Sequence, residues 1–279
     1  YNQMKIFVTG SNGFIGSHVV KKALDSGHEI VGLRRSNKLE KISLPRQPIW
    51  VEGTLESDIR QAAEGCEAII HLAAYGVNPK FVSWQEAFRW NVSASIHLLS
   101  QAKLMGIKRV VIAGSCSEYG RSAERYEYVP CAAPLEPVNA YGASKAAATL
   151  ASMAFAREND LELVVLRLFH IYGEGESQER LWPSLKKAAL AGEDFPMTLG
   201  EQIRDFTPVE FAAENLIYNA VEAIIPKGEP QVHNLGTGRP MSLSSFAEKQ
   251  WKKFGATGRL KLGEIPYRNN EVMRYVPLV

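Results

Sequence analysis

Short apolar runs alternate with segments of helical periodicity over the first two-thirds of this chain. Runs with the length and residue types of buried strands lie at residues 4–8, 29–33, 48–51, 68–72, 109–113 and 161–168. Apolar residues recur at helical spacing behind the first of these runs, and again over residues 83–105 and 140–158. This alternation predicts an α/β fold in which a doubly wound parallel sheet carries helices on both faces.

The pattern changes after Gly173, where Pro and Gly become more frequent and the apolar segments shorter. Predicted helices lie at residues 181–191, 208–223 and 242–254, and a predicted strand at residues 231–235. We divide the chain into a sheet domain over residues 1–172 and a smaller lobe over residues 173–279, parts of which can return to the sheet domain. The lobe is expected to fold over the carboxyl edge of the sheet, where open α/β proteins bind ligands.

Composition narrows the class of protein. A chain of 279 residues that is 46% hydrophobic can bury a full core, and a net charge of +2 gives no reason to expect a nucleic-acid partner. Cys66, Cys116 and Cys131 are odd in number and widely spaced, which fits neither a disulfide framework nor a metal site and is typical of a reducing compartment. No apolar run approaches the roughly 18 residues of a membrane span, and the first residues do not look like a signal peptide. We expect a cytoplasmic protein with no membrane partner.

Three glycines separate the first predicted strand from its helix. Gly10, Gly13 and Gly16 have the spacing G-x-x-G-x-x-G. A tight glycine turn at a helix start directs free N–H groups and the helix dipole at one point, which favours an anion. The context predicts a site for the pyrophosphate of a dinucleotide, and an ordinary strand–helix turn is the alternative.

Tyr141 and Lys145 are four residues apart in the predicted helix 140–158, so their side chains share one face. An ammonium beside a phenol favours the phenolate and lowers the phenol pKa, which makes the phenol usable as an acid or base near neutrality. A Tyr-x-x-x-Lys spacing also occurs by chance.

The segment Thr9-Gly10-Ser11-Asn12-Gly13-Phe14-Ile15-Gly16 resembles the cofactor loop of the extended short-chain dehydrogenase/reductase superfamily, the NAD(P)-dependent sugar-nucleotide epimerases, dehydratases and reductases. Further segments similar to the family's motifs are 71–74, 91–92, 134–145 and 167–173. The resemblance implies a Rossmann-type fold and the following cofactor-binding residues: Gly10, Asn12, Gly13, Phe14, Ile15, Gly16, Arg34, Leu72, Ala73, Ala74, Asn91, Tyr141, Lys145 and Phe169. Thr54 stands where many members have an Asp that contacts adenine.

The same resemblance implies a catalytic set of Ser115, Tyr141 and Lys145. Ser115 would hydrogen-bond the substrate oxygen while Tyr141 exchanges a proton with it, and Lys145 would hold the nicotinamide ribose. The family's 4,6-dehydratases have Asp-Glu directly after the hydroxyl residue, whereas Cys116 and Ser117 stand here. Glu118 is one residue later, and on an extended segment it would face the other side. Dehydratase chemistry is therefore disfavoured.

Substrate contacts are implied for Ser117, His170, Arg204 and Arg268. His170 replaces the family's Asn, as a substrate contact or as a structural hydrogen-bonder. The segments 200–206 and 266–271 resemble the two arginine sites for a nucleotide-sugar diphosphate, and each guanidinium fork matches phosphate oxygens. Ordinary ion pairs of Arg204 with Asp205 and of Arg268 with Glu271 are the alternative.

The segments G-E-Q-I-R-D-F and R-N-N-E-V-M are similar to the CDP-abequose and CDP-paratose synthase group, NADPH-dependent reductases of a 4-keto-6-deoxyhexose. None of residues 33–36 is acidic, and Arg34 at the end of the second strand suits a 2′-phosphate, with Arg35 beside it. We expect an NADP-dependent reductase of a nucleotide sugar, with NAD as the alternative cofactor.

An NAD-dependent nucleotide-sugar 4-epimerase is the alternative activity, and a non-catalytic cofactor-sensing protein is a remote one. No metal ion is expected. Small and apolar residues in helices 83–105 and 140–158 indicate a homodimer, because related enzymes pair these helices. The family's usual C-terminal helix is absent after residue 279, so the chain given can be incomplete.

Overall fold

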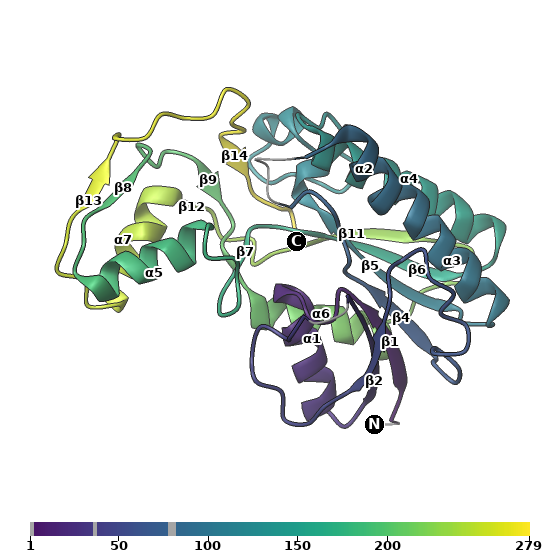
Figure 1. Cartoon of the computed structure of the whole chain (residues 1–279). Coiled ribbons are helices and arrows are strands. Elements are labelled where there is room, and N and C mark those ends of the chain that lie inside the picture. Colours follow the sequence, from purple (N-terminus) through teal and green to yellow (C-terminus); the bar gives the residue numbers. More distant parts are fainter. Residues whose placement is uncertain (1–2, 36–37, 78–81) are drawn as a thin grey trace.

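The computed structural model describes residues 3–35, 38–77 and 82–279 (Figure 1). Its centre is a seven-stranded parallel sheet in the order β11-β6-β5-β4-β1-β2-β3, which confirms the predicted doubly wound fold. The strands are β1 (Lys5–Thr9), β2 (Glu29–Arg34), β3 (Ile49–Glu52), β4 (Ala68–His71), β5 (Arg109–Ser115), β6 (Glu162–Leu168) and β11 (Gln231–Leu235). The chain reverses its direction across the sheet between β1 and β4. Open α/β sheets bind their ligands at this point.

Helices cover both faces of the sheet (Figure 1). The helices α1 (Phe14–Asp25) and α6 (Val209–Val221) pack side by side on one face, and their apolar residues share a core with β1, β4, β5 and β6. The other face carries α2 (Trp84–Phe88), α3 (Ala94–Leu104) and α4 (Ala140–Glu158). The predicted helix 83–105 is confirmed as a helical run from Trp84 to Leu104, in which the π-helical turn η2 (Arg89–Ser93) lies between α2 and α3.

The smaller lobe lies beside the sheet on the side of β7 (Ile171–Tyr172) (Figure 1). It contains α5 (Leu181–Ala191) and α7 (Leu243–Lys253), which pack on each other. Its short strands are β8 (Phe195–Met197), β9 (Ile203–Arg204), β12 (Met241–Ser242), β13 (Leu260–Leu262) and β14 (Arg274–Tyr275), and β10 (Thr207–Pro208) pairs with β7. Between these elements the chain returns to the first domain, because α6 covers the large sheet and β11 forms its edge.

The turn between β1 and α1 depends on its glycines. Gly10 has a φ of +63°, and a side chain at Gly16 would place its Cβ 1.9 Å from the carbonyl oxygen of Gly10. Helix α1 therefore approaches the end of β1 as closely as two backbones can. Within the described part of the chain, the helices are too short or too polar to cross a membrane.

Candidate active site

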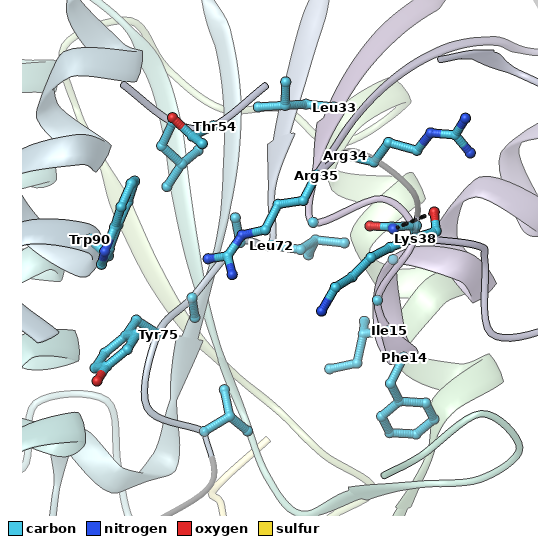
Figure 2. A pocket seen from close by; sticks show the side chains of 18 of the residues that line it. Phe14, Ile15, Leu33, Arg34, Arg35, Lys38, Thr54, Leu72, Tyr75 and Trp90 are labelled. Carbon is cyan, nitrogen blue, oxygen red and sulfur yellow. Dashed lines mark hydrogen bonds between the residues drawn. The ribbon is translucent and has the colours of Figure 1, made fainter. Parts of the chain in front are cut away.

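A cavity of about 460 Å³ opens at the carboxyl end of β1, β2 and β4 (Figure 2). Its floor is the glycine turn, and its walls come from the ends of β2 and β4. Most of the predicted cofactor residues line it: Gly10, Asn12, Gly13, Phe14, Ile15, Gly16, Arg34, Leu72, Ala73 and Ala74. Among the described residues, no side chain caps Gly13 at the start of α1, so the first N–H groups of that helix face the cavity.

Four predicted cofactor residues are not among those that line the cavity: Asn91, Tyr141, Lys145 and Phe169. Phe169 is fully buried and packs against the ring of Tyr119, so its side chain belongs to the core. Asn91 is also buried, in the π-turn η2. Its amide oxygen accepts a hydrogen bond from the backbone N of Tyr75, and its amide nitrogen donates to the Tyr75 carbonyl and to Ser144 Oγ. Asn91 thus shapes the cavity wall at Tyr75 and ties it to α4.

A second buried chain of hydrogen bonds lies beneath the cavity. Thr9 Oγ1 accepts hydrogen bonds from the backbone N–H groups of Leu72 and Ala73, so its hydroxyl donates to His71 Nδ1 at 2.7 Å. His71 Nε2 then donates to Ser95 Oγ, which donates to the carbonyl oxygen of Asn91. Burial, and to a lesser degree the charge of Lys145, lowers the pKa of His71 to about 3, so this ring is neutral. The chain fixes β1, β4 and η2 relative to one another.

Ser115, Tyr141 and Lys145 lie near one another and next to Ala113, a residue that lines the cavity. Ser115 ends β5, and its hydroxyl lies close enough to the phenol of Tyr141 to lower the phenol pKa. Lys145 is buried and donates to the carbonyl oxygen of Ala113 at 2.7 Å, and Ala113 itself lines the cavity. The Asn139 side chain caps α4 at Gly142 N, which places Tyr141 and Lys145 on consecutive turns of one face.

The expected lowering of the Tyr141 pKa by Lys145 is wrong for this structure. Burial raises the pKa of Tyr141 to about 12, against a smaller opposing effect of the hydrogen bond with Ser115. Burial also lowers the pKa of Lys145. Near neutral pH the Tyr141 phenol therefore keeps its proton, which suits a group that donates a proton to a substrate oxygen.

Glu118 is buried beside the catalytic set rather than on an extended segment. Residues Cys116–Glu118 form a 3-10 turn, and Glu118 Oε1 accepts a hydrogen bond from the backbone N of Ser115. Its other oxygen pairs with Arg167 Nε at 2.8 Å. The argument from strand alternation was therefore wrong in its premise. With both oxygens bonded inside the protein, Glu118 positions Ser115.

Cys116 is equally unsuited to acid–base chemistry. Burial raises the pKa of its thiol to about 12, which keeps it protonated.

The basic residues of the cavity are not arranged as expected, because Arg35 and Lys38 rather than Arg34 direct their charges into it (Figure 2). Arg34 lines the cavity, but its guanidinium lies over the ring of Trp50, 4.5 Å from the centroid, and its buried Nε has no hydrogen-bond partner within the described residues. Figure 2 shows Arg35 and Lys38 with their charged ends directed into the cavity, while Arg34 turns outward. Ser36, the last of the four non-acidic positions, is outside the described residues.

The residues expected to bind substrate lie in two different environments. Arg204 is buried; it pairs with Glu271 at 2.9 Å and also donates to the carbonyl oxygen of Val272. The alternative pairings within Arg204–Asp205 and Arg268–Glu271 are wrong, since Asp205 instead accepts from Thr207, Thr237 and Gly238 N. Arg268 is exposed in the loop before Glu271.

His170 and Ser117 lie nearer the catalytic set. Ser117 is half-buried in the turn after β5, and its backbone N donates to Ser115 Oγ. His170 has a φ of +35°, a conformation that residues other than Gly rarely adopt and that is enriched at functional sites. Its buried Nδ1 has no hydrogen-bond partner within the described residues. Burial, with the charges of Arg204 and Arg180, lowers its pKa well below the usual value.

Sequence reasoning missed several residues of the cavity wall, among them Lys38, Tyr75, Val77 and Trp90. Two of them had a signal, because Tyr75 directly follows the His71–Ala74 segment and Trp90 precedes Asn91. Groups of His, Cys, Asp or Glu that could hold a metal ion are not found among the described residues.

The chain is similar to known proteins over most of its length. Residues 6–236 match the model of the NAD dependent epimerase/dehydratase family. The chain is 26% identical over 274 residues to CDP-abequose synthase of Salmonella muenchen, covering 96% of this chain and 87% of the relative. It is 26% identical over 267 residues to UDP-glucose 4-epimerase of Corynebacterium glutamicum, covering 88% and 79%. The structure of MoeE5 in complex with UDP-glucuronic acid and NAD superimposes with a TM-score of 0.84 at 28% identity, covering 99% of this chain and 90% of that one.

We predict that Glu118→Ala destabilises the protein by about 3–5 kcal/mol, because it leaves Arg167 buried without its partner. Urea unfolding of wild type and variant measures the difference. Glu136→Ala is the matched control, since it removes a carboxylate from a solvent-exposed pair with Arg125 and should change stability little. Similar losses for the two variants would contradict the role of the buried pair.

Proposed function

This chain belongs to the NAD dependent epimerase/dehydratase family, and on that premise we propose that it is an oxidoreductase of nucleotide sugars. We propose further that it reduces the 4-keto group of a nucleotide-linked 4-keto-6-deoxyhexose. The observation that carries this proposal is the arrangement of Ser115 at the end of β5 beside Tyr141 and Lys145 on α4, with a buried Tyr141 phenol whose raised pKa keeps it protonated. Reduction of a ketone needs such a proton donor at the carbonyl oxygen.

The proposed roles follow from the positions of the three side chains. Ser115 and Tyr141 hold the carbonyl oxygen between their hydroxyls, and Tyr141 transfers its proton to that oxygen. Lys145, which donates to the carbonyl oxygen of Ala113, is proposed to bind a ribose hydroxyl of the cofactor and to supply a positive charge beside Tyr141. When bound, the reduced nicotinamide cofactor supplies the hydride that adds to the carbonyl carbon.

The residues present fit a dinucleotide. The glycine turn leaves no room for a Cβ at Gly16, the start of α1 is uncapped among the described residues, and the basic side chains of Arg35 and Lys38 line the cavity. The cavity volume of about 460 Å³ lies within the range of cofactor sites. We propose NADPH as the preferred cofactor, with Arg35 and Lys38 as the groups that meet its 2′-phosphate and NAD as the alternative. MoeE5 was solved with NAD.

A 4-epimerase is the second candidate, because a UDP-glucose 4-epimerase is as similar to this chain as the CDP-abequose synthase is. The Ser, Tyr and Lys set serves both reactions. The basic residues at the end of β2 favour the reductase, since a reductase must exchange its cofactor at each turnover and a cellular NADPH pool supplies reduced cofactor. Arg204 and Arg268 are proposed to hold the diphosphate, with Glu271 positioning Arg204.

A homodimer is proposed from the outer surface of α2, α3 and α4 (Figure 1). Large apolar side chains are exposed there: Trp84, Phe88, Leu104 and Leu150. Exposed apolar patches of this kind mark association surfaces.

We predict that Tyr141→Phe lowers kcat by about two to four orders of magnitude and leaves cofactor affinity nearly unchanged, because it removes the proton donor alone. The assay follows NADPH oxidation with nucleotide-linked 4-keto-6-deoxyhexoses, in which wild type should consume one NADPH per ketone. Tyr128→Phe, at an exposed phenol, is the control. Interconversion of C4 epimers without net NADPH consumption would instead identify the epimerase.

For the cofactor, Arg35→Asp should weaken NADPH binding by about ten- to a hundredfold, since one charge-assisted contact is lost and a repulsive one is gained. NADH binding should change far less. Arg34→Asp should have a smaller effect, because the Arg34 guanidinium lies on Trp50. Fluorescence titration of both cofactors measures this, with Arg60→Ala as an exposed control. Equal losses for NADH and NADPH would refute the assignment.

For the dimer, Leu150→Lys should convert the protein to a monomer at micromolar concentration, because it places a charge within the proposed interface. Ile224→Lys changes an even more exposed apolar residue next to α6, on the opposite face of the sheet, and should leave the dimer intact. Sedimentation velocity distinguishes the species. A wild-type protein that sediments as a monomer would exclude the interface.

A further inference from the structure

One end of the cavity, here called the β3 end, follows the carboxyl end of β3 and is lined by Thr54 and Leu55 together with Trp90 (Figure 2). In the sheet, β5 and β3 lie on opposite sides of β1, which leads into the glycine turn. Ala113 on β5 accepts a hydrogen bond from Lys145, so the reacting half of a dinucleotide extends from the turn toward β5. The other half of such a dinucleotide extends toward β3 and reaches the β3 end.

Contacts with two neighbouring segments hold Trp90 in this wall. Trp90 lies in the π-helical turn η2, and its Nε1 donates to Glu86 Oε2 on α2 at 2.9 Å. The guanidinium of Arg89 lies 4.8 Å from the centroid of the indole. Arg89 also forms two hydrogen bonds of 2.8 Å with Glu56, in the loop after β3. The nitrogen of the indole is therefore already bonded, and the ring offers its π-surface to the cavity.

One face of this ring is directed into the cavity. Figure 2 shows the indole of Trp90 edge-on, with a face toward the side on which the guanidinium of Arg35 lies. An aromatic ring and a guanidinium are the two kinds of side-chain group that stack on a nucleobase. The β3 end therefore offers stacking partners to a flat heteroaromatic ring.

The edge of such a ring finds fewer partners. None of the described residues that line the cavity is acidic, and Thr54 stands where many members of the family have an Asp that contacts adenine. The backbone N of Thr54 donates to Ser57 Oγ at 2.9 Å, and its Oγ1 accepts from the backbone N of Glu56 at 3.2 Å. The amino group of an adenine thus meets no carboxylate among these residues, which leaves the faces of the ring to carry recognition.

We propose that Trp90 is the residue that binds the adenine of the cofactor, by stacking its indole on one face of the base. The inference deepens the proposed function and rests on it, because it takes the occupant of the cavity to be a nicotinamide adenine dinucleotide. Every base has a π-face, so stacking tolerates a change of the groups on the edge of the base. Trp90 therefore supplies affinity for a purine without selecting adenine by its amino group.

The test titrates the full protein with NADPH or NADH, whichever binds wild type more tightly, and follows the fluorescence of the nicotinamide. Trp90→Leu keeps an apolar side chain without an aromatic ring, and it should weaken binding of the dinucleotide by about five- to a hundredfold. Trp90→Phe keeps a π-face and should restore most of the affinity. Reduced nicotinamide mononucleotide, which lacks the adenosine half, should bind both variants as it binds wild type.

Trp182→Leu is the matched control. Trp182 is also half-buried, and its Nε1 donates to Gln250 Oε1 at 3.2 Å, but it lies on α5 in the smaller lobe and does not line the cavity. This variant should bind the dinucleotide as wild type does. A further measurement needs no variant, since the hypoxanthine analogue of the cofactor should bind wild type about as tightly as the adenine cofactor.

Unchanged affinity in Trp90→Leu, or an equal loss in Trp90→Phe and Trp90→Leu, would overturn the inference alone. Equal weakening of the dinucleotide and the mononucleotide would also overturn it, because Trp90 would then shape the cavity without contacting the base. Much weaker binding of the hypoxanthine analogue to wild type would show that the amino group is recognised, against the inference. Absence of binding of both NADPH and NADH to wild type would overturn the proposed function, and the inference with it.

Discussion

The buried ion pair between Glu118 and Arg167 is the constraint on which the arrangement of the catalytic end depends. Glu118 is fully buried, and Gly114 on β5 provides the space for its carboxylate. One oxygen fixes the backbone of Ser115, and the guanidinium on the other extends the network to Tyr119 and to the carbonyl oxygen of Cys131. A buried charged pair is stable only with all its hydrogen bonds made. The ends of β5 and β6 and the turn Cys116–Glu118 after β5 therefore form one unit.

The same unit explains how Ser115, Tyr141 and Lys145 are held in fixed positions. Ser115 stands at the end of a central strand and is held through its backbone, while Tyr141 and Lys145 stand on a capped helix that packs on the same sheet. Each side chain thus projects from a rigid element. The buried chain from Thr9 through His71 to Asn91 does the same for the cofactor side, and the two networks meet at Ser144, which bonds both Asn91 and the Tyr141 carbonyl.

Local patterns in the sequence predicted what local physics determines. The strand that begins at Arg109 and the helix 140–158 were placed correctly because a β-branched run and helical periodicity are properties of adjacent residues. The structure differs from the sequence analysis at side chains whose environment is built by distant segments. Phe169 is buried against Tyr119, Arg204 pairs with Glu271, 67 positions away, instead of with Asp205, and the Tyr141 pKa follows its burial. The π-turn at Asn91 likewise accompanies hydrogen bonds of Asn91 with Tyr75 and Ser144, and helical periodicity in the sequence does not predict these contacts.

The sheet is completed late in the chain, and this determines the order in which the protein can fold. Helix α6 packs on α1, and β11 pairs with β6. In the sequence, however, α5 and the short strands β8, β9 and β10 of the smaller lobe lie between β6 and α6. During synthesis the part of the sheet face that α6 covers, over β4 and β5, therefore stays uncovered until residues 209–221 have emerged. Contacts across so many residues carry a large loop-closure entropy, which slows folding and prolongs the exposure of apolar strands. The apolar surface of the incomplete sheet domain is thus most exposed to aggregation and to chaperone binding while the chain is being synthesised.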